Sequence, residues 1–260
     1  MRSYDNPVTF DGVDLNSVEG LIITKVDPHR LPKRRVTSYD LANFNGSATT
    51  SAFYGGRDIT ISASIRRPSR ELLDASISEL RRIADPLNKT LRVPMESSYR
   101  DFYNVTLNNM SLQDMNGGYV AATLEFNASD LYSYDTVTTE LLNALNLTSG
   151  DRSYPVTFEG TADQAPIVTY TVDSLTGGTN EDVVLTNPLT GVSVTVNRTW
   201  TAGEVLVVDC WNKTVQVDGA DAEFTGNFPV WRTGAGHLNY SDGFTERQVD
   251  INVVYTKRYR

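Results

Sequence analysis

The side chains best suited to catalysis in this sequence are pairs of carboxylates and one histidine. Carboxylates stand close together at Glu181/Asp182 and at Asp218/Asp221. Two carboxylates hydrolyse glycosidic bonds when they face each other across a cleft, which spacing along the chain does not establish. His237 has no Ser or Cys motif beside it that would supply a nucleophile. The sequence therefore predicts no catalytic residue.

Groups that bind metals or cofactors are scarce. The sequence has one cysteine, Cys210, and two histidines, His29 and His237, too few for an intrachain disulfide or a Cys/His zinc site. Asp242-Gly243 lacks the repeated aspartates of a calcium loop, and no Gly-rich loop leads into a helix to bind phosphate. We expect no metal ion, no cofactor and no enzymatic activity.

The overall charge is acidic, with a net charge of −9 and a pI of about 4.8. Nucleic acids and anionic membranes bind to basic surfaces that displace counterions, so we expect neither nucleic-acid readout nor membrane binding. The first residues contain no apolar signal-peptide core, and no stretch approaches the ~20 apolar residues that cross a bilayer. The sequence predicts a soluble protein without membrane insertion.

Alternation of apolar and polar residues with period two predicts β-strands along most of the chain. The apolar side chains of residues 58–65 fall on one face of a predicted strand, and residues 120–126 repeat the pattern. Asn116-Gly117-Gly118 predicts a hairpin turn before the second of these strands, because Gly tolerates the positive φ that such turns need. Further short strands are predicted at 21–26 and 103–107.

One α-helix is predicted, and it begins after Ser69, which can cap the helix N-terminus. Apolar residues recur at helical spacing and form one stripe: Leu73, Ile77, Leu80 and Ala84. Arg81 and Arg82 suit the negative end of the helix dipole, and Asp85-Pro86 ends the helix. A single amphipathic helix must lie against a sheet to bury its stripe.

A domain boundary is predicted between residues 130 and 153. Residues 136–147 could form a short helix with Leu141, Leu142 and Leu145 on its apolar side, and residues 148–153 form a polar linker. Strands at roughly ten-residue intervals then suit an antiparallel sandwich: 166–172, 182–186, 191–196, 204–209 and 214–217. The predicted parts are a domain 1–135, a linker 136–153 and a domain 154–260.

Two stretches resemble the distal tail proteins of siphophages. The first runs from 8–15 (VTFDGVDL) through 54–61 (YGGRDITI) and the predicted helix to 91–94 (LRVP). The second contains, in order, 154–160 (YPVTFEG), 165–168 (APIV), 206–209 (LVVD), 213–219 (KTVQVDG), Trp231-Arg232 and 234–240 (GAGHLNY). Their order and spacing cover nearly the whole chain, although 236–239 match loosely and 30–53 do not align.

The resemblance implies a mostly β fold: an N-terminal β-sandwich with one α-helix and an extended arm, then a galectin-like antiparallel β-sandwich. It implies a structural hub at the virion tail tip, made and assembled in the host cytoplasm, whose N-terminal domains form a homo-hexameric ring. The implied partners are the tail tube protein, the tail-associated tip protein and a receptor-binding or tail fibre protein. The alternative functions are a carbohydrate-binding module for host cell-surface glycans and a glycan hydrolase.

Residues 30–57 contain the predicted contacts with other subunits or partners. Arg34 and Arg35 end a basic run that is either such a contact, including one to tape measure or DNA in the lumen, or a solvated loop. Residues 39–57 have no clean period and contain Phe53 and Tyr54, which favours an arm that orders on a neighbouring subunit over an unrecognised strand pair. Arg57 closes this segment and is counted among the contacts.

Charge is distributed unevenly within the first predicted domain. Residues 25–100 contain 14 basic and 8 acidic residues, whereas residues 101–150 contain no basic and 6 acidic residues. The two regions either complement each other between copies of the chain or neutralise each other within one domain.

Three tryptophans, Trp200, Trp211 and Trp231, fall in the second predicted domain. Exposed Trp beside polar residues stacks on sugar rings in lectins, and Trp231 next to Arg232 is the candidate for glycan stacking. The alternative is that these tryptophans fill the core of the sandwich.

Overall fold

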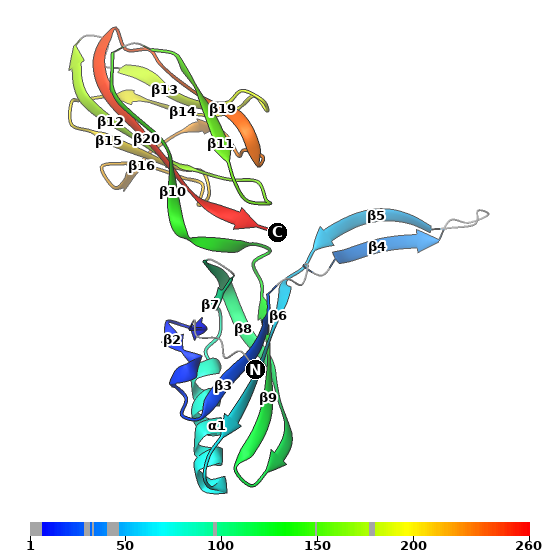
Figure 1. The fold of residues 1–260 in the computed structure, drawn as a ribbon. Coiled ribbons are helices and arrows are strands. Elements are labelled where there is room, and N and C mark those ends of the chain that lie inside the picture. Colours follow the sequence, from blue (N-terminus) through cyan, green and yellow to red (C-terminus); the bar gives the residue numbers. More distant parts are fainter. Residues whose placement is uncertain are drawn as a thin grey trace. The chain divides into compact units, whose positions relative to one another are not determined.

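The computed structural model describes residues 7–28, 32, 34–40, 47–95, 98–148, 150–176 and 180–260. Contacts divide the chain into two compact units, Met1–Thr136 with Arg260, and Val137–Tyr259. Antiparallel strands make up both units, and the described residues include one α-helix. The mostly β fold class predicted from the sequence is confirmed (Figure 1).

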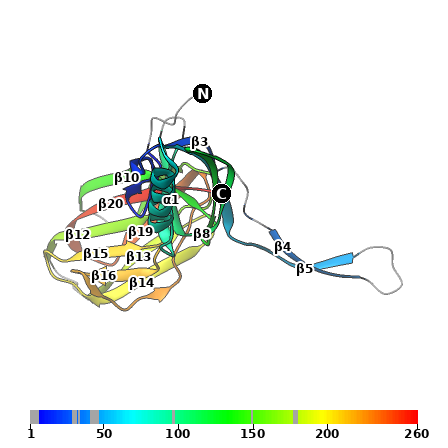
Figure 2. The ribbon, with the colours of Figure 1, turned by 90° about the horizontal axis from the view of Figure 1, so that it is seen from below.

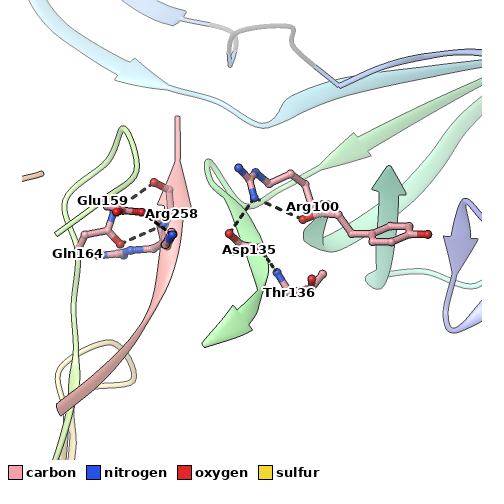
Figure 3. A network of polar contacts seen from close by, with 8 residues as sticks. Arg100, Asp135, Thr136, Glu159, Gln164 and Arg258 are labelled. Carbon is pink, nitrogen blue, oxygen red and sulfur yellow. Dashed lines mark hydrogen bonds and ion pairs between the residues drawn. The ribbon is translucent and has the colours of Figure 1, made fainter. Parts of the chain in front are cut away.

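The first unit contains a sheet, one α-helix and a separate hairpin. Its elements are β1 (Thr9–Phe10), β2 (Val13–Asp14), the 3-10 helix η1 (Leu15–Ser17), β3 (Leu21–Asp27), β4 (Arg34–Asp40), β5 (Ser47–Tyr54), β6 (Arg57–Arg66), α1 (Arg70–Ala84), β7 (Lys89–Pro94), β8 (Tyr99–Asn116) and β9 (Tyr119–Ala128). The strands of the sheet are hydrogen-bonded in the order β2-β1-β7-β8-β9-β6-β3. Strand β10 (Ser133–Leu147) begins beside β8, where Asp135 pairs with Arg100 and their side chains form an ion pair at 3.3 Å (Figure 3).

The core of the first unit forms on one face of this sheet. Strand β6 pairs with β9 so that Ile59 lies opposite Phe126 and Ile61 opposite Leu124, and all four side chains are buried. The predicted turn joins β8 to β9, with Gly117 in the left-handed region at φ 52°. Alternation in the sequence therefore predicted both strands and the face that they bury.

Helix α1 covers this core, as its apolar stripe predicted. The Ser69 hydroxyl accepts a hydrogen bond from the Leu72 amide at 3.3 Å, which caps the first turn. Leu73, Ile77 and Leu80 are buried and belong to the same apolar cluster as the sheet. Figure 1 shows α1 alongside β3 and β6.

The second unit is a sandwich of two antiparallel sheets, ordered β10-β20-β12-β15-β16-β17 and β11-β19-β13-β14-β18. Its further elements are β11 (Arg152–Phe158), β12 (Ile167–Thr176), β13 (Asn180–Asn187), β14 (Val192–Thr199), β15 (Val205–Asp209), β16 (Thr214–Val217), β17 (Ala220–Asp221), β18 (Thr225–Gly226), β19 (Gly234–Asp242) and β20 (Glu246–Tyr259). Side chains from both sheets share one apolar core that includes Tyr170 and Trp200. Figure 2 shows β12, β15 and β16 side by side in one layer.

The strands predicted for the second unit are confirmed, since each falls within or largely within one of β12 to β16. A turn at Asp218-Gly219 joins β16 to β17, and both residues adopt positive φ. Short strands with regular turn signals therefore sufficed to predict this sandwich.

The short helix predicted at residues 136–147 is wrong, because these residues form most of β10. Residues 136–139 read Thr-Val-Thr-Thr, and β-branched side chains favour strands over helices. The strand pairs with β20, and side-chain contacts such as that from Asn252 Nδ2 to Glu140 Oε2 at 2.9 Å accompany the pairing. The apolar residues that suggested a helical stripe instead lie along this strand, where Leu141 and Leu142 pack partly against the core.

The burial of Cys210 predicts how the stability of the protein depends on pH in the alkaline range. Burial raises the pKa of its thiol to about 12 from an ordinary value of 9.0, and the neighbouring Asp209 carboxylate adds to the effect. Between these two pH values the folded chain keeps a proton that the unfolded chain has lost. The contribution of this thiol to stability is therefore complete below about pH 9 and declines as pH rises toward 12.

The same pKa predicts that the native thiol is nearly inert. At pH 8 its thiolate is roughly a thousandfold less abundant than that of an exposed cysteine. We expect Ellman's reagent to react with the chain in urea but only very slowly in native buffer, with N-acetylcysteine as the control for the intrinsic rate. Fast reaction in native buffer would show that Cys210 is accessible.

Candidate interaction surfaces

Strands β4 and β5 form a hairpin that pairs with no other strand of the described chain (Figures 1 and 2). Arg34 lies opposite Tyr54 and Arg35 opposite Phe53 at the base of this ladder. Of the two interpretations left open for residues 39–57, a strand pair is therefore the correct backbone structure. Residues 29–31, 33 and 41–46, which include parts of the predicted basic loop and arm, lie outside the described residues.

Most of the described side chains of the hairpin are exposed, and Ser51 is half-buried. Phe53 is 68% exposed and Tyr54 46% exposed, and Arg34, Arg35 and Val36 are exposed as well. The Arg34 guanidinium lies 5.9 Å from the centre of the Tyr54 ring, within range of a cation–π contact. A two-stranded hairpin without a buried face has marginal stability in water. The hairpin thus presents aromatic and basic side chains suited to a partner surface.

Arg57 differs from the other residues predicted as contacts, because it is only 4% exposed. Its Nη1 donates to Ser133 Oγ at 3.4 Å, and its guanidinium lies 5.7 Å from the centre of the Phe102 ring. Burial lowers the pKa of Arg57, and the nearby Asp130 carboxylate opposes this effect. Arg57 is therefore an internal residue at the base of the hairpin, and its predicted role as a surface contact does not fit.

The proposed glycan stacking of Trp231 does not fit the structure either. Trp231 is 2% exposed, its ring stacks on Phe158 at 5.6 Å, and its Nε1 donates to the His237 carbonyl at 2.8 Å. Arg232 is exposed, but the ring next to it in sequence faces the core. The alternative interpretation, a core tryptophan, is correct for Trp231 and for the fully buried Trp200.

Sequence reasoning did not single out Trp211, which is 42% exposed. The Arg258 guanidinium lies 4.3 Å from the centre of the Trp211 ring. Gln164 holds the backbone of Arg258, because its Oε1 accepts from Arg258 N at 3.1 Å and its Nε2 donates to Arg258 O at 3.2 Å (Figure 3). From the sequence, Trp211 could be placed only on a turn after the strand predicted at 204–209. No pattern in the sequence linked it to Arg258.

The carboxylates considered for catalysis hold the second unit together locally. Asp182 Oδ1 accepts from Asn197 Nδ2 at 2.6 Å, Asp218 Oδ1 from Val205 N at 2.9 Å, and Asp221 Oδ1 from Gln216 Nε2 at 3.1 Å. Glu181 adjoins Asp182 on one strand, and successive side chains of a strand point to opposite faces. These contacts give Asp182, Asp218 and Asp221 structural roles.

His237 has a serine neighbour that the sequence did not reveal. Ser153 Oγ and His237 Nδ1 are 3.1 Å apart across β11 and β19, and the pair is exposed. A nucleophile and a base also need a third group that orients the base. Within the described part of the chain, no carboxylate is bonded to the other ring nitrogen of His237.

Two further observations concern metals and membranes. Over the described residues, no group of three or more His, Cys, Asp or Glu side chains is placed to hold a metal ion. The helices found there are also too short or too polar to span a membrane.

Comparisons with known proteins agree with this architecture. Residues 159–259 match the family model described as siphovirus-type tail component, C-terminal domain. The fold is similar to that of the Dit protein of phage SPP1, with a TM-score of 0.75 and 16% identity, covering 98% of this chain and 99% of that one. That protein is described as a paradigm of the hub adsorption apparatus in phages that infect Gram-positive bacteria. No curated protein sequence matches the chain.

Two structures of the phage P2 baseplate in its activated conformation, with Ca and with Sr, are also similar. Their TM-scores are 0.46 and 0.44, at 8% and 7% identity, and each covers 95% of this chain and 96% of that chain. This similarity is too low to support an argument about function.

The chain is thus a mostly β protein with the fold of the SPP1 Dit protein. The match of residues 159–259 to the C-terminal domain of siphovirus-type tail components, together with this fold, confirms the resemblance of the chain to siphophage distal tail proteins.

Proposed function

We propose that this chain is the structural hub of a phage tail tip. Copies of it assemble into a homo-hexameric ring that joins the tail tube protein to the tail-associated tip protein and to a receptor-binding or tail fibre protein. The observation that carries the proposal is the β4–β5 hairpin, which pairs with no described strand and exposes Phe53 and Tyr54.

A second copy of the chain is the occupant that best suits this hairpin. Aromatic side chains bury a large apolar area for little loss of conformational freedom, and a neighbour would cover the described side chains that the hairpin leaves exposed. The fold is similar over 98% of the chain to that of the SPP1 protein, which is described as a paradigm of the hub adsorption apparatus, and this supports a hub role.

Charge makes a smaller contribution to this assembly. Two of the six acidic residues in 101–150 form ion pairs within their own unit, Asp101 with Arg92 and Asp135 with Arg100. These pairs favour the interpretation that charges are partly neutralised inside one domain. Exposed ion pairs contribute little stability each, so the aromatic contacts should dominate and high salt should weaken the ring only partly.

In this proposal, the hub binds partners and catalyses no reaction. Its place is the virion tail tip, after synthesis and assembly in the host cytoplasm. The carboxylates and His237 support local structure, as described above, and need no catalytic role to explain their positions.

Electron microscopy and analytical ultracentrifugation of the purified full chain test the proposal. We expect a ring of identical subunits, with a sedimentation coefficient that corresponds to six copies. A folded monomer at tens of micromolar would contradict it. A stand-alone carbohydrate-binding module, the alternative function, requires no ring and would act through the second unit alone.

A further inference from the structure

Trp211 stands out among the three tryptophans because its indole reaches solvent. It is 42% exposed, whereas Trp200 and Trp231 are 0% and 2% exposed. It lies on the turn between β15 and β16, directly after Cys210, whose side chain is in the core. A large apolar ring at such an exposed turn adds little to the core and is available to a ligand.

The backbone that carries Trp211 is held firmly. Asp209 Oδ1 accepts hydrogen bonds from the amides of Trp211 and Asn212, both at 2.9 Å, and Asp209 Oδ2 accepts from Asn212 Nδ2 at 2.8 Å. The Cys210 amide donates to the Pro166 carbonyl at 3.1 Å. A turn fixed in this way loses little entropy when a ligand binds, which favours affinity.

Arg258 supports the indole. Its guanidinium carbon lies 4.3 Å from the centre of the ring, and its side chain is almost fully buried. The backbone of Arg258 is hydrogen-bonded to the fully buried Gln164 side chain. These bonds fix the position from which the Arg258 side chain extends. The ring is thus held by a cation and keeps its remaining exposed area toward solvent.

The neighbours of Trp211 on the turn are polar. Asn212, Lys213 and Thr214 are exposed and offer amide, ammonium and hydroxyl groups. The core of a protein–protein interface is mostly apolar, whereas these three neighbours in sequence are polar. One apolar ring bordered by hydrogen-bonding groups instead suits a small ligand with an apolar face and several hydroxyls, which is the chemistry of a pyranose.

We propose that Trp211 is the stacking platform of a weak glycan-binding site, where Asn212, Lys213 and Thr214 bond the sugar hydroxyls and Arg258 holds the ring. The site takes the place of the Trp231-Arg232 pair that the sequence suggested. It is independent of the hub function, because it needs no ring and no other tail protein.

Saturation-transfer NMR on the full chain tests this site with three sugars: lactose, maltotriose and chitotriose. We expect at least one sugar to bind the native chain with a millimolar dissociation constant. Trp211→Ala should weaken that binding at least about tenfold, and Trp211→Phe should keep part of it. The matched control is Leu189→Ala, which removes a 78% exposed apolar side chain from a loop of the other sheet.

Unchanged thermal unfolding of Trp211→Ala would show that lost binding is not lost folding. The proposal is overturned if none of the three sugars binds the native chain at 10 mM, on the order of the weakest useful affinity. It is also overturned if Trp211→Ala binds as well as the native chain. Loss of binding to another tail protein in Trp211→Ala, without sugar binding by the native chain, would identify the turn as a protein contact and reject the glycan site.

Discussion

Replacing Arg247 by Met is expected to lower the free energy of unfolding of the second unit by about 3–5 kcal/mol. Arg247 and Asp242 form an ion pair whose side chains are 1% and 0% exposed. Without the arginine, the Asp242 carboxylate stays buried and loses its counter-charge. Removing one member of a buried pair therefore costs far more than the intact pair contributes.

Arg247 also anchors the segment that joins β10 to β11. Its Nη1 donates to the Leu147 carbonyl at 2.9 Å, and its Nη2 donates to the Gly150 carbonyl at 3.4 Å. The hydroxyl of Tyr240 donates to the same Asp242 carboxylate, and burial raises the pKa of Tyr240 well above its usual range. The loss of Arg247 thus disturbs a buried polar network whose members depend on one another.

Urea unfolding followed by tryptophan fluorescence measures this effect selectively. All three tryptophans lie between residues 137 and 259, so the signal reports on the second unit. Lys257→Met is the control, because it breaks the pair with Glu159, which is 65% exposed, and should cost less than about 1 kcal/mol. Asp242→Leu combined with Arg247→Met should recover part of the loss, since no charge is then buried. Equal midpoints for Arg247→Met and Lys257→Met would contradict the expectation.

Helices and strands that bury one face were predictable, because such burial makes apolar residues recur at a regular spacing in the sequence. The stripe of α1 and the alternation of β6 and β9 are examples, and all three elements formed where they were expected. The hairpin escaped recognition for the opposite reason. Consecutive residues Arg34 to Ser38 are all exposed, so this described part of β4 forms no buried face and shows no alternation.

The contacts of the candidate sites depend on sheet order, which the sequence did not reveal. Arg258 on β20 reaches Trp211 because β20 pairs with β12 and β12 pairs with β15. For Trp231 two interpretations stayed open, because its neighbour Arg232 suggested a surface position, whereas the indole packs on Phe158 in the core. Residues 136–147 were misjudged because their leucines imitate a helical stripe, and strand pairing with β20 decides the structure there.

Excising the β4–β5 hairpin is expected to abolish self-assembly and to leave both units folded. Residues 34–54 can be replaced by a short Gly/Ser linker, because Arg34 and Tyr54 are cross-strand partners whose Cα atoms lie about 5 Å apart. The hairpin shares no strand pairing with the main sheet, so its removal breaks no ladder there. Tryptophan fluorescence and circular dichroism should therefore show unchanged unfolding, while sedimentation at tens of micromolar should show a monomer.

Two substitutions within the hairpin test whether its exposed aromatic rings, and not only its backbone, are needed for assembly. Phe53→Ser and Tyr54→Ser each remove an exposed ring, and a central aromatic contact contributes about 2 kcal/mol or more, or roughly a 30-fold change in the dissociation constant of one interface. Leu189→Ser, at an even more exposed apolar position of the second unit, should leave assembly unchanged. Each copy in a closed ring contributes its hairpin to an interface, so the loss is repeated at every contact and the ring should dissociate over a narrow range of concentration. A ring of native size formed by the excised chain would show instead that other surfaces hold the subunits together.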